Sequence, residues 1–338
     1  MSVGKIKIAF IGCGAISAFH YKAIEAFDNA EVIGVFDANI ERAKAFADER
    51  GIGVFESKEA LLLSDADLVT ICTPSGLHAP LAIECLDAGK NVVLEKPVAI
   101  TVEECQMLLE AEKRSHRFCA PISQLRYYDD IRRARSIVES GELGKVVLCD
   151  LYMKYYRSDE YFATSTWRGT KAMDGGGALM NQGIHGIDAM RYIVGDVEEI
   201  SAKVRTLVHN VEVEDTAVAS VVFKSGAIGV IEGTTSVRPG YPRRLEIHFE
   251  KGSMIIEENT IVSIDTPEGS QKAESKAMNS SSDPLNISYE GHRRQYQNIL
   301  ATIEGKEQLF YTASEAAKTV ETILAIYRSS EENKTQYL

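Results

Sequence analysis

Apolar and polar positions follow two different patterns along the chain, and the change falls near residue 123. Before it, short apolar runs alternate with segments whose apolar residues recur at helical spacing. This alternation predicts βαβ units and a doubly wound parallel sheet. The expected strands are residues 5–11, 31–37, 54–55, 67–72, 91–94 and 118–122.

Capping signals bound several of the expected helices. Asn39 stands where an N-cap is needed, and Gly51 follows the last apolar residue of that helix. Thr101 and Glu104 have the spacing of a capping box for a helix that ends near Ser115. These signals place the helices between the strands, as a parallel sheet requires.

The second part of the chain, residues 124–338, is expected to form an α+β domain with an open, mainly antiparallel sheet. Strand runs recur between residues 197 and 265 after a strand at 145–156, with turn signals between them. Residues 266–285 are rich in Ser, Glu and Lys and predict a surface loop, and residues 332–338 predict a frayed tail. The expected helices are residues 130–140, 177–194, 289–305 and 312–330.

Composition narrows the class of protein. The chain has 338 residues and a net charge of −12 without a basic stripe, which argues against a nucleic-acid partner. It has no apolar stretch near the ~18 residues of a membrane span and no signal-peptide pattern, so we expect no membrane partner. None of its six cysteines forms a CxxC pair, which favours free thiols in the cytoplasm.

The stretch from Lys5 to Ser17, KIKIAFIGCGAIS, joins a strand to a helix through a glycine turn. Gly12 permits the tight turn, and Gly14 lets the backbone approach a pyrophosphate at the helix N-terminus. Ser17 stands at the third small position of the fingerprint. Asp37, at the end of the second strand, can bind the ribose hydroxyls and would repel a 2′-phosphate, which favours NAD over NADP.

Two further segments end strands at the same expected edge of the sheet. The loop Thr73–His78, TPSGLH, follows a buried strand and opens a helix, so it can line a cofactor; His78 can also be an ordinary polar side chain. Glu95, Lys96 and Pro97 end the next strand. A lysine beside a positively charged nicotinamide ring should have a lowered pKa and can exchange a proton with a substrate hydroxyl. The alternative is a solvated surface lysine.

The helix of residues 177–194 carries Asn181, His185 and Asp188 within one arc. A histidine of near-neutral pKa suits a general base, although it can also be satisfied within a domain interface. His185 and Asp188 could also be metal ligands, but no third ligand has matching spacing, and we expect no metal. Three glycines, 175–177, permit a close backbone approach before this helix.

A polar loop before the glycines holds Trp167 and Arg168, with Arg157 and Tyr161 nearby in the sequence. Aromatic and arginine side chains fit sugar stacking and anion or hydroxyl binding. They fit an oligomer interface equally well.

Taken together, these motifs resemble the Gfo/Idh/MocA family of nicotinamide-dependent oxidoreductases over nearly the whole chain. The specific parts are the GxGxxS turn with Asp37, TPSGLH, EKP at 95–97, and GGGALMNQGIHGID at 175–188. The resemblance implies a Rossmann domain, expected at 1–123, and a C-terminal domain whose sheet forms homodimers or homotetramers. It also implies catalysis by Lys96 and His185, with Asn181 in place of the aspartate that many members carry.

The expected activity is hydride transfer between NAD and a secondary hydroxyl, at C3 of a sugar, glycoside or UDP-sugar. Alternatives are an inositol or other cyclic-polyol dehydrogenase, and a non-catalytic dinucleotide-binding regulator. The expected substrate-binding residues are Lys96, Arg157, Arg168, Asn181 and His185. The expected cofactor-binding residues are Gly12, Cys13, Gly14, Ala15, Ile16, Asp37, Arg42, Thr73, Pro74, Ser75, His78, Glu95, Lys96, Gln124, Trp167 and Arg168.

Overall fold

A computed structural model describes residues 4–274 and 288–338 of the chain. The chain forms two compact units, the first made of residues 1–124 and 289–317, the second of residues 125–288 and 318–338. The first unit therefore includes a segment that returns to it late in the sequence, whereas the predicted boundary assigned everything after residue 123 to the second domain.

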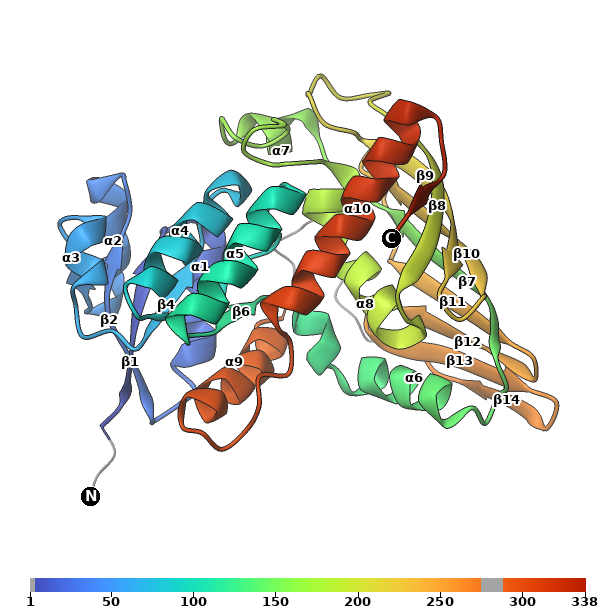
Figure 1. Ribbon diagram of the computed structural model, residues 1–338, viewed down its shortest axis with the longest axis horizontal. Helices are drawn as coiled ribbons and strands as arrows, with labels where there is room; N and C mark the ends of the chain where they lie inside the picture. The colour runs from blue at the N-terminus through green and yellow to red at the C-terminus, as the bar shows by residue number, and fades with distance from the viewer. Residues whose placement is uncertain (1–3, 275–287) are drawn as a thin grey trace. The chain divides into compact units, whose positions relative to one another are not determined.

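The first unit is a six-stranded parallel sheet with strand order β3-β2-β1-β4-β5-β6 (Figure 1). The order reverses direction between β1 and β4, which confirms the predicted doubly wound topology. Its strands are β1 (Ile6–Ile11), β2 (Ala30–Phe36), β3 (Gly53–Val54), β4 (Leu68–Ile71), β5 (Asn91–Leu94) and β6 (Cys119–Pro121).

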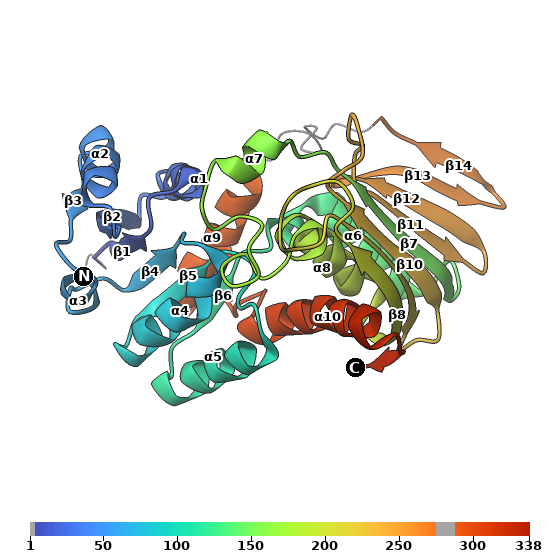
Figure 2. The same cartoon turned by 90° about the horizontal axis from the view of Figure 1, so that it is seen from above.

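Helices cover both faces of this sheet. Helices α4 and α5 lie side by side in both views, and α1 packs with α9 (Figures 1 and 2). Asn39 caps α2 with its side chain and Gly51 ends it in the left-handed conformation, as predicted. The helices of this unit are α1 (Ala15–Ile24), α2 (Ile40–Arg50), α3 (Lys58–Leu62), α4 (His78–Asp87), α5 (Val102–Ser115) and α9 (Glu290–Ile303), with one 3-10 turn at Ser75–Leu77 and another beginning at Gln124 (Gln124–Tyr127).

The second unit is built on a nine-stranded mixed sheet, order β14-β13-β12-β11-β7-β10-β9-β8-β15. Its strand pairs are antiparallel except β7 with β10, which run parallel, so the sheet is mainly antiparallel as predicted. Its strands are β7 (Val146–Lys154), β8 (Val197–Arg205), β9 (Thr216–Phe223), β10 (Ile228–Thr234), β11 (Arg244–Phe249), β12 (Gly252–Glu257), β13 (Thr260–Thr266), β14 (Gly269–Lys272) and β15 (Gln336–Tyr337).

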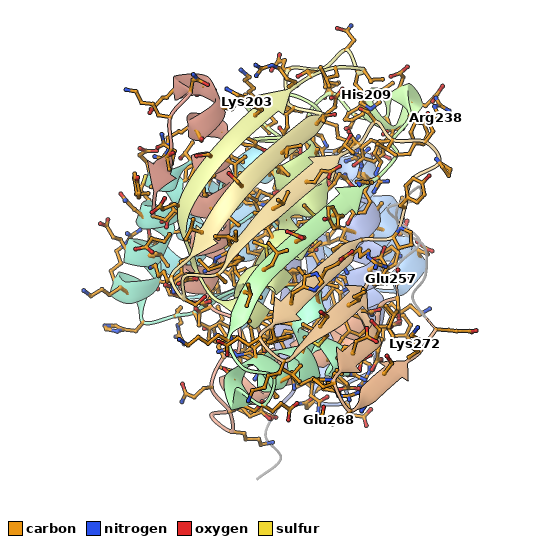
Figure 3. The ribbon with its side chains drawn as sticks, turned by 90° about the vertical axis from the view of Figure 1, so that its right-hand side faces the viewer. Lys203, His209, Arg238, Glu257, Glu268 and Lys272 are labelled. Atoms are coloured by element: carbon orange, nitrogen blue, oxygen red, sulfur yellow. The ribbon has the colours of Figure 1, made fainter. Side chains whose placement is uncertain are left out.

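Helix α8 packs on one face of this sheet against β7, and α6 packs on α8. Figure 3 looks onto the other face, across which no helix of the described residues runs. The helices of this unit are α6 (Asp129–Ser140), α7 (Asp159–Ala163), a π-helical turn (Ala178–Gly183) and α8 (Ile184–Val194), and α10 (Ala313–Glu332) begins in the first unit and ends in the second.

Three local predictions need correction. The predicted helix 177–194 opens with a π-helical turn, in which the backbone amides of Asn181 and Gln182 both donate to the Gly177 carbonyl. The tail predicted to fray pairs as β15 with β8. Within the predicted loop 266–285, residues 269–272 form β14, and residues 275–287 lie outside the described part of the chain. For β14 and β15, pairing across the sheet supplied the partners that local patterns do not reveal.

A buried ion pair holds α8 in the second unit. Arg126 donates two hydrogen bonds to the Asp188 carboxylate, at 2.8 and 2.7 Å, and both side chains are at most 4% exposed. The Thr319 hydroxyl donates a third, at 3.0 Å. Asp188 therefore anchors the helix that carries His185.

Replacing Asp188 with Asn should destabilise the protein by about 3–5 kcal/mol, because it leaves the buried guanidinium of Arg126 without its counter-charge. Urea unfolding followed by circular dichroism measures this change. The control is Asp87→Asn, which breaks the exposed pair with Arg114 and should leave the midpoint close to that of the wild type. Equal midpoints for the two variants would contradict the assigned structural role of Asp188.

Candidate active site

The glycine turn after β1 has the geometry that a bound pyrophosphate requires. Gly12 has a φ of +95°, and a Cβ there would lie 2.6 Å from the carbonyl oxygen of Cys72, so only glycine fits. Gly14 stands at the N-cap of α1 and has no side chain to cap the helix. The amides of Ala15 and Ile16 are therefore uncapped and can donate to an anion, whereas the Ser17 amide donates to the Gly14 carbonyl at 3.1 Å.

Asp37 follows β2 directly and turns its carboxylate toward this loop. One oxygen accepts a hydrogen bond from the Cys13 amide and the other from the Asn39 amide, each at 2.8 Å. Each carboxylate oxygen keeps a second lone pair, which a ribose hydroxyl could use. Arg42 lies 3.9 Å from the carboxylate and keeps a largely exposed side chain beside it.

The TPSGLH loop follows β4, the strand beside β1 at the switch point of the sheet. The hydroxyl oxygen of Thr73 is buried without a hydrogen-bond partner, so it is a polar atom that a bound ligand can satisfy. His78 is fully buried, and its ring nitrogens lie 2.6 Å from the Pro97 carbonyl oxygen and 2.9 Å from that of Thr73. Burial lowers the pKa of His78. The histidine thus links this loop to the EKP turn.

The turn at residues 95–97 follows β5 at the same sheet edge. Lys96 is half-buried, its amide donates to the Glu95 carboxylate at 3.0 Å, and its peptide bond to Pro97 is cis. The loops after β1, β2, β4 and β5 thus converge at one edge of the first unit. The unpartnered Thr73 hydroxyl, the glycine turn and the uncapped amides of Ala15 and Ile16 together fit a dinucleotide.

In the second unit, the π-helical turn presents Asn181 and Gln182 in a polar network. The Asn181 side-chain amide donates to the Asp174 carboxylate, and its oxygen accepts from Gln182 at 3.0 Å. The Gln182 oxygen accepts two hydrogen bonds from the Arg157 guanidinium, at 3.1 and 2.7 Å, and its amide donates to the Tyr161 hydroxyl at 2.8 Å. The network therefore joins Asn181 and Arg157, two of the expected substrate-binding residues.

The three glycines before this turn allow two buried groups to approach the backbone. A Cβ on Gly176 would lie 2.2 Å from the Tyr327 hydroxyl, and one on Gly177 would lie 2.0 Å from the Glu214 carbonyl oxygen. The Glu214 carboxylate accepts from the amides of Gly177 and Leu179 and from the Tyr327 hydroxyl, each at 2.8 Å. Burial raises the pKa of Glu214 despite these bonds. Glu214 thereby fixes the start of the π-helical turn.

The loop with the single Trp is held by contacts between its own side chains. The Arg168 guanidinium lies over the rings of Tyr161 and Trp167, at 4.7 and 5.4 Å from their centroids, and donates to the Thr164 hydroxyl. The Nε of Arg168 is buried without a partner. The loop therefore offers a guanidinium nitrogen framed by aromatic rings.

The structure places the three candidate residues of the predicted helix 177–194 in different surroundings. His185 lies half-buried at the start of α8, one turn beyond Asn181, whereas Asp188 is committed to Arg126. Sequence reasoning missed Asp174, Gln182 and Glu214. The sequence signal for Asp174 and Gln182 is their place beside the glycine run and Asn181, whereas no local signal points to Glu214, which contacts Gly177 from 37 residues away.

Comparison with known families gives matches in both halves of the chain. Residues 6–122 match the oxidoreductase family model with an NAD-binding Rossmann fold, and residues 131–255 match the GFO/IDH/MocA C-terminal domain model. An uncharacterised oxidoreductase of Bacillus subtilis is 31% identical over 259 residues, covering 74% of this chain and 73% of the relative. A myo-inositol 2-dehydrogenase of Thermotoga maritima is 27% identical over 273 residues, covering 77% and 78%.

A solved structure resembles the chain over its whole length. The WlbA dehydrogenase of Chromobacterium violaceum, in complex with NADH and UDP-GlcNAcA, aligns with a TM-score of 0.89 and 31% identity. The alignment covers 100% of this chain and 97% of that one. Among the described residues, no helix is long and apolar enough to cross a membrane.

Replacing Asp37 with Ser should reduce the preference for NAD over NADP at least tenfold, because the carboxylate that repels a 2′-phosphate is lost. Dissociation constants for both dinucleotides measure this preference. Asp48→Ser removes an exposed acidic side chain from α2 and should leave the preference unchanged. An unchanged preference in the Asp37 variant would exclude the assigned discrimination.

Replacing Asn181 with Asp should place a second carboxylate against Asp174. The two would share a proton, so the pKa of the pair rises in the folded state above its unfolded value. A folded state that binds more protons gains stability as the pH falls, so the loss of melting temperature should be larger at pH 8.5 than at pH 5. The double variant Asp174→Asn with Asn181→Asp should recover most of the loss at pH 8.5. A loss independent of pH would contradict this pairing.

Proposed function

This chain belongs to the GFO/IDH/MocA family of NAD-binding oxidoreductases, and we propose from that premise that it oxidises the C3 hydroxyl of a sugar nucleotide or a related sugar. The observation that carries the proposal is the full-length similarity to a dehydrogenase crystallised with NADH and UDP-GlcNAcA. The WRGTKAMDGGGALMNQGIHGID segment supports it, because its polar residues form the Asp174–Asn181–Gln182–Arg157 network.

The first unit holds the cofactor. Gly12 and Gly14 would cradle the pyrophosphate, Asp37 would bind the adenosine ribose, and Thr73 would line the site after β4. NAD, when bound, accepts the hydride that leaves the carbinol carbon of the substrate. Lys96, at the end of β5, would donate a hydrogen bond to the reacting oxygen and stabilise the developing alkoxide.

The second unit supplies the other residues of the proposed chemistry. His185 would take the hydroxyl proton as general base, and the roles of His185 and Lys96 can be exchanged. Asn181, whose side-chain amide is fixed by Asp174 and Gln182, would orient a neighbouring hydroxyl rather than carry charge. Arg157 and Arg168 would bind anionic groups of the substrate, a uronate or a diphosphate.

A second candidate is a cyclic-polyol dehydrogenase, which the 27% identity to a myo-inositol 2-dehydrogenase favours. Absorbance at 340 nm, followed with NAD and a panel of UDP-sugars, sugars, glycosides and inositols, separates the two candidates. NMR of the product then identifies the oxidised carbon. Dinucleotide binding without turnover on the whole panel would instead favour a non-catalytic regulator.

Lys96→Ala and His185→Ala should each lower turnover at least ~100-fold, the lower range for loss of acid–base catalysis. Stopped-flow or steady-state formation of NADH on the best substrate of the panel measures it. Lys171→Ala, in the loop before the glycine run, serves as the control and should retain near-normal turnover. Near-normal rates in both active-site variants would reject the assignment of the two catalytic residues.

We also propose that the protein works in the cytoplasm, where its six free cysteines stay reduced.

We further propose that copies of the chain associate through the open face of the nine-stranded sheet (Figure 3). On that face, Ile228 is 56% exposed and its register neighbours are Val222 and Leu148. Ile228→Glu should therefore increase the monomer fraction in light scattering. An unchanged assembly would exclude this face.

A further inference from the structure

A buried cluster of one carboxylate and two imidazoles lies next to the edge of the first unit where the predicted cofactor loops converge. Glu95 is only 6% exposed, although it immediately follows β5 at the end where the cofactor loops converge. One of its carboxylate oxygens lies 2.9 Å from the Nε2 of His20 and 3.9 Å from that of His292. The other accepts the Lys96 amide at 3.0 Å. The carboxylate therefore joins α1, β5 and α9.

The hydrogen-bond chain continues away from the carboxylate into the core. The second ring nitrogen of His20 lies 2.9 Å from the Tyr296 hydroxyl, which lies 3.0 Å from the hydroxyl of Thr70 in β4. The rings of His20 and His292 meet edge to face, with centroids 5.0 Å apart. All five side chains belong to the first unit, so the whole cluster is part of the cofactor domain.

The cluster keeps a negative charge in an interior where charges are costly. Burial opposes the ionisation of Glu95, but its contacts with His20 and His292 outweigh burial and hold its pKa well below the usual range. Burial lowers the pKa of His20, which disfavours a charged imidazolium beside the carboxylate. The His20 ring lies 2.9 Å from the carboxylate, and this contact favours the ionised form of Glu95.

A cluster that only held α1, β5 and α9 together would not need a charged carboxylate. A neutral glutamine could accept the same backbone amide and bond to a histidine, and burying an anion costs free energy that good packing could avoid. The position suggests what the charge does instead. Ligands of open parallel sheets bind outside the carboxyl ends of the strands, and a charge held in a low-dielectric interior acts strongly on a neighbouring charge.

We propose that the Glu95 carboxylate biases the cofactor site toward the oxidised dinucleotide, whose nicotinamide ring carries a positive charge that the reduced form lacks. The bias favours release of the reduced cofactor over that of the oxidised one. This inference rests on the cofactor role in the proposed function, and it requires neither the sugar substrate nor the assigned proton acceptor.

The test is the ratio of the dissociation constants of NAD⁺ and NADH, measured at pH 8 without sugar on full-length protein freed of bound cofactor. NADH fluorescence gives one constant, and competition by NAD⁺ gives the other. Glu95→Gln should raise the ratio at least fivefold, mainly by weakening NAD⁺ binding. An unchanged ratio, or a change caused by NADH alone, would overturn the proposal.

Glu112→Gln is the matched control. This carboxylate is also partly buried in the first unit and accepts a backbone amide, that of Cys119, at 2.8 Å. Cys119 is the first residue of β6, so the carboxylate lies at the amino-end edge of the sheet, away from the cofactor loops. The ratio should not change in this variant. A shift as large as that of Glu95→Gln would show that any buried carboxylate has the effect and would overturn the proposal.

If Glu95→Gln does not fold, a second variant tests the proposal. His292→Gln keeps the carboxylate and replaces the imidazole that lies 3.9 Å from it with a neutral amide, so the ratio should not rise. A fivefold rise would overturn the proposal.

Glu95, His20 and His292 have possible metal-ligand atoms within 4.8 Å of one another, a spacing that a metal ion could bridge. Stoichiometric zinc in the purified wild type, lost in either variant, would also overturn the proposal, because the cluster would then be cationic.

Wild-type protein that binds neither dinucleotide would refute the proposed function together with this inference. A failure to find a sugar substrate would affect the proposed function alone, since no sugar enters the binding measurement. The two proposals can therefore fail separately.

Discussion

The parallel direction of six strands is the constraint on which the proposed chemistry depends. Because all six strands run the same way, the residues that follow β1, β2, β4 and β5 emerge at one edge of the sheet. The glycine turn, Asp37, the TPSGLH loop and the EKP turn are far apart in the sequence, yet this topology alone gathers them. His78 then joins the last two loops, because its ring nitrogens lie within hydrogen-bond distance of the Thr73 and Pro97 carbonyl oxygens.

In the second unit, buried carboxylates fix the orientation of the π-helical turn and of α8. They do so by accepting hydrogen bonds from the donors around these two elements. Glu214 takes two amides at the start of the π-helical turn, Asp174 takes the Asn181 amide, and Asp188 takes Arg126. These three buried carboxylates are therefore paired with N–H or O–H donors, as an interior requires. In this framework the π-helical turn carries Asn181 and the start of α8 carries the half-buried His185.

Much of the fold could be predicted from the sequence, because its signals are short-ranged. Asn39, Gly51 and Thr101 cap or end helices as expected, since a capping side chain reaches only two or three residues. The π-helical turn and strand β15 could not be predicted in this way. The first depends on Glu214, which lies 37 residues from Gly177, and the second on a pairing with β8.

The sequence by itself determined the Rossmann fingerprint with an aspartate after the second strand, the mainly antiparallel character of the second sheet and the family, because each depends on residue types at fixed local spacing. Only the tertiary structure decided which polar groups are partners. His20 and Tyr296 are 276 residues apart and share a hydrogen bond, and Glu95 lies between two histidines from different helices. The energy of such a cluster depends on burial and on distances between remote segments, and no window of the sequence contains either quantity.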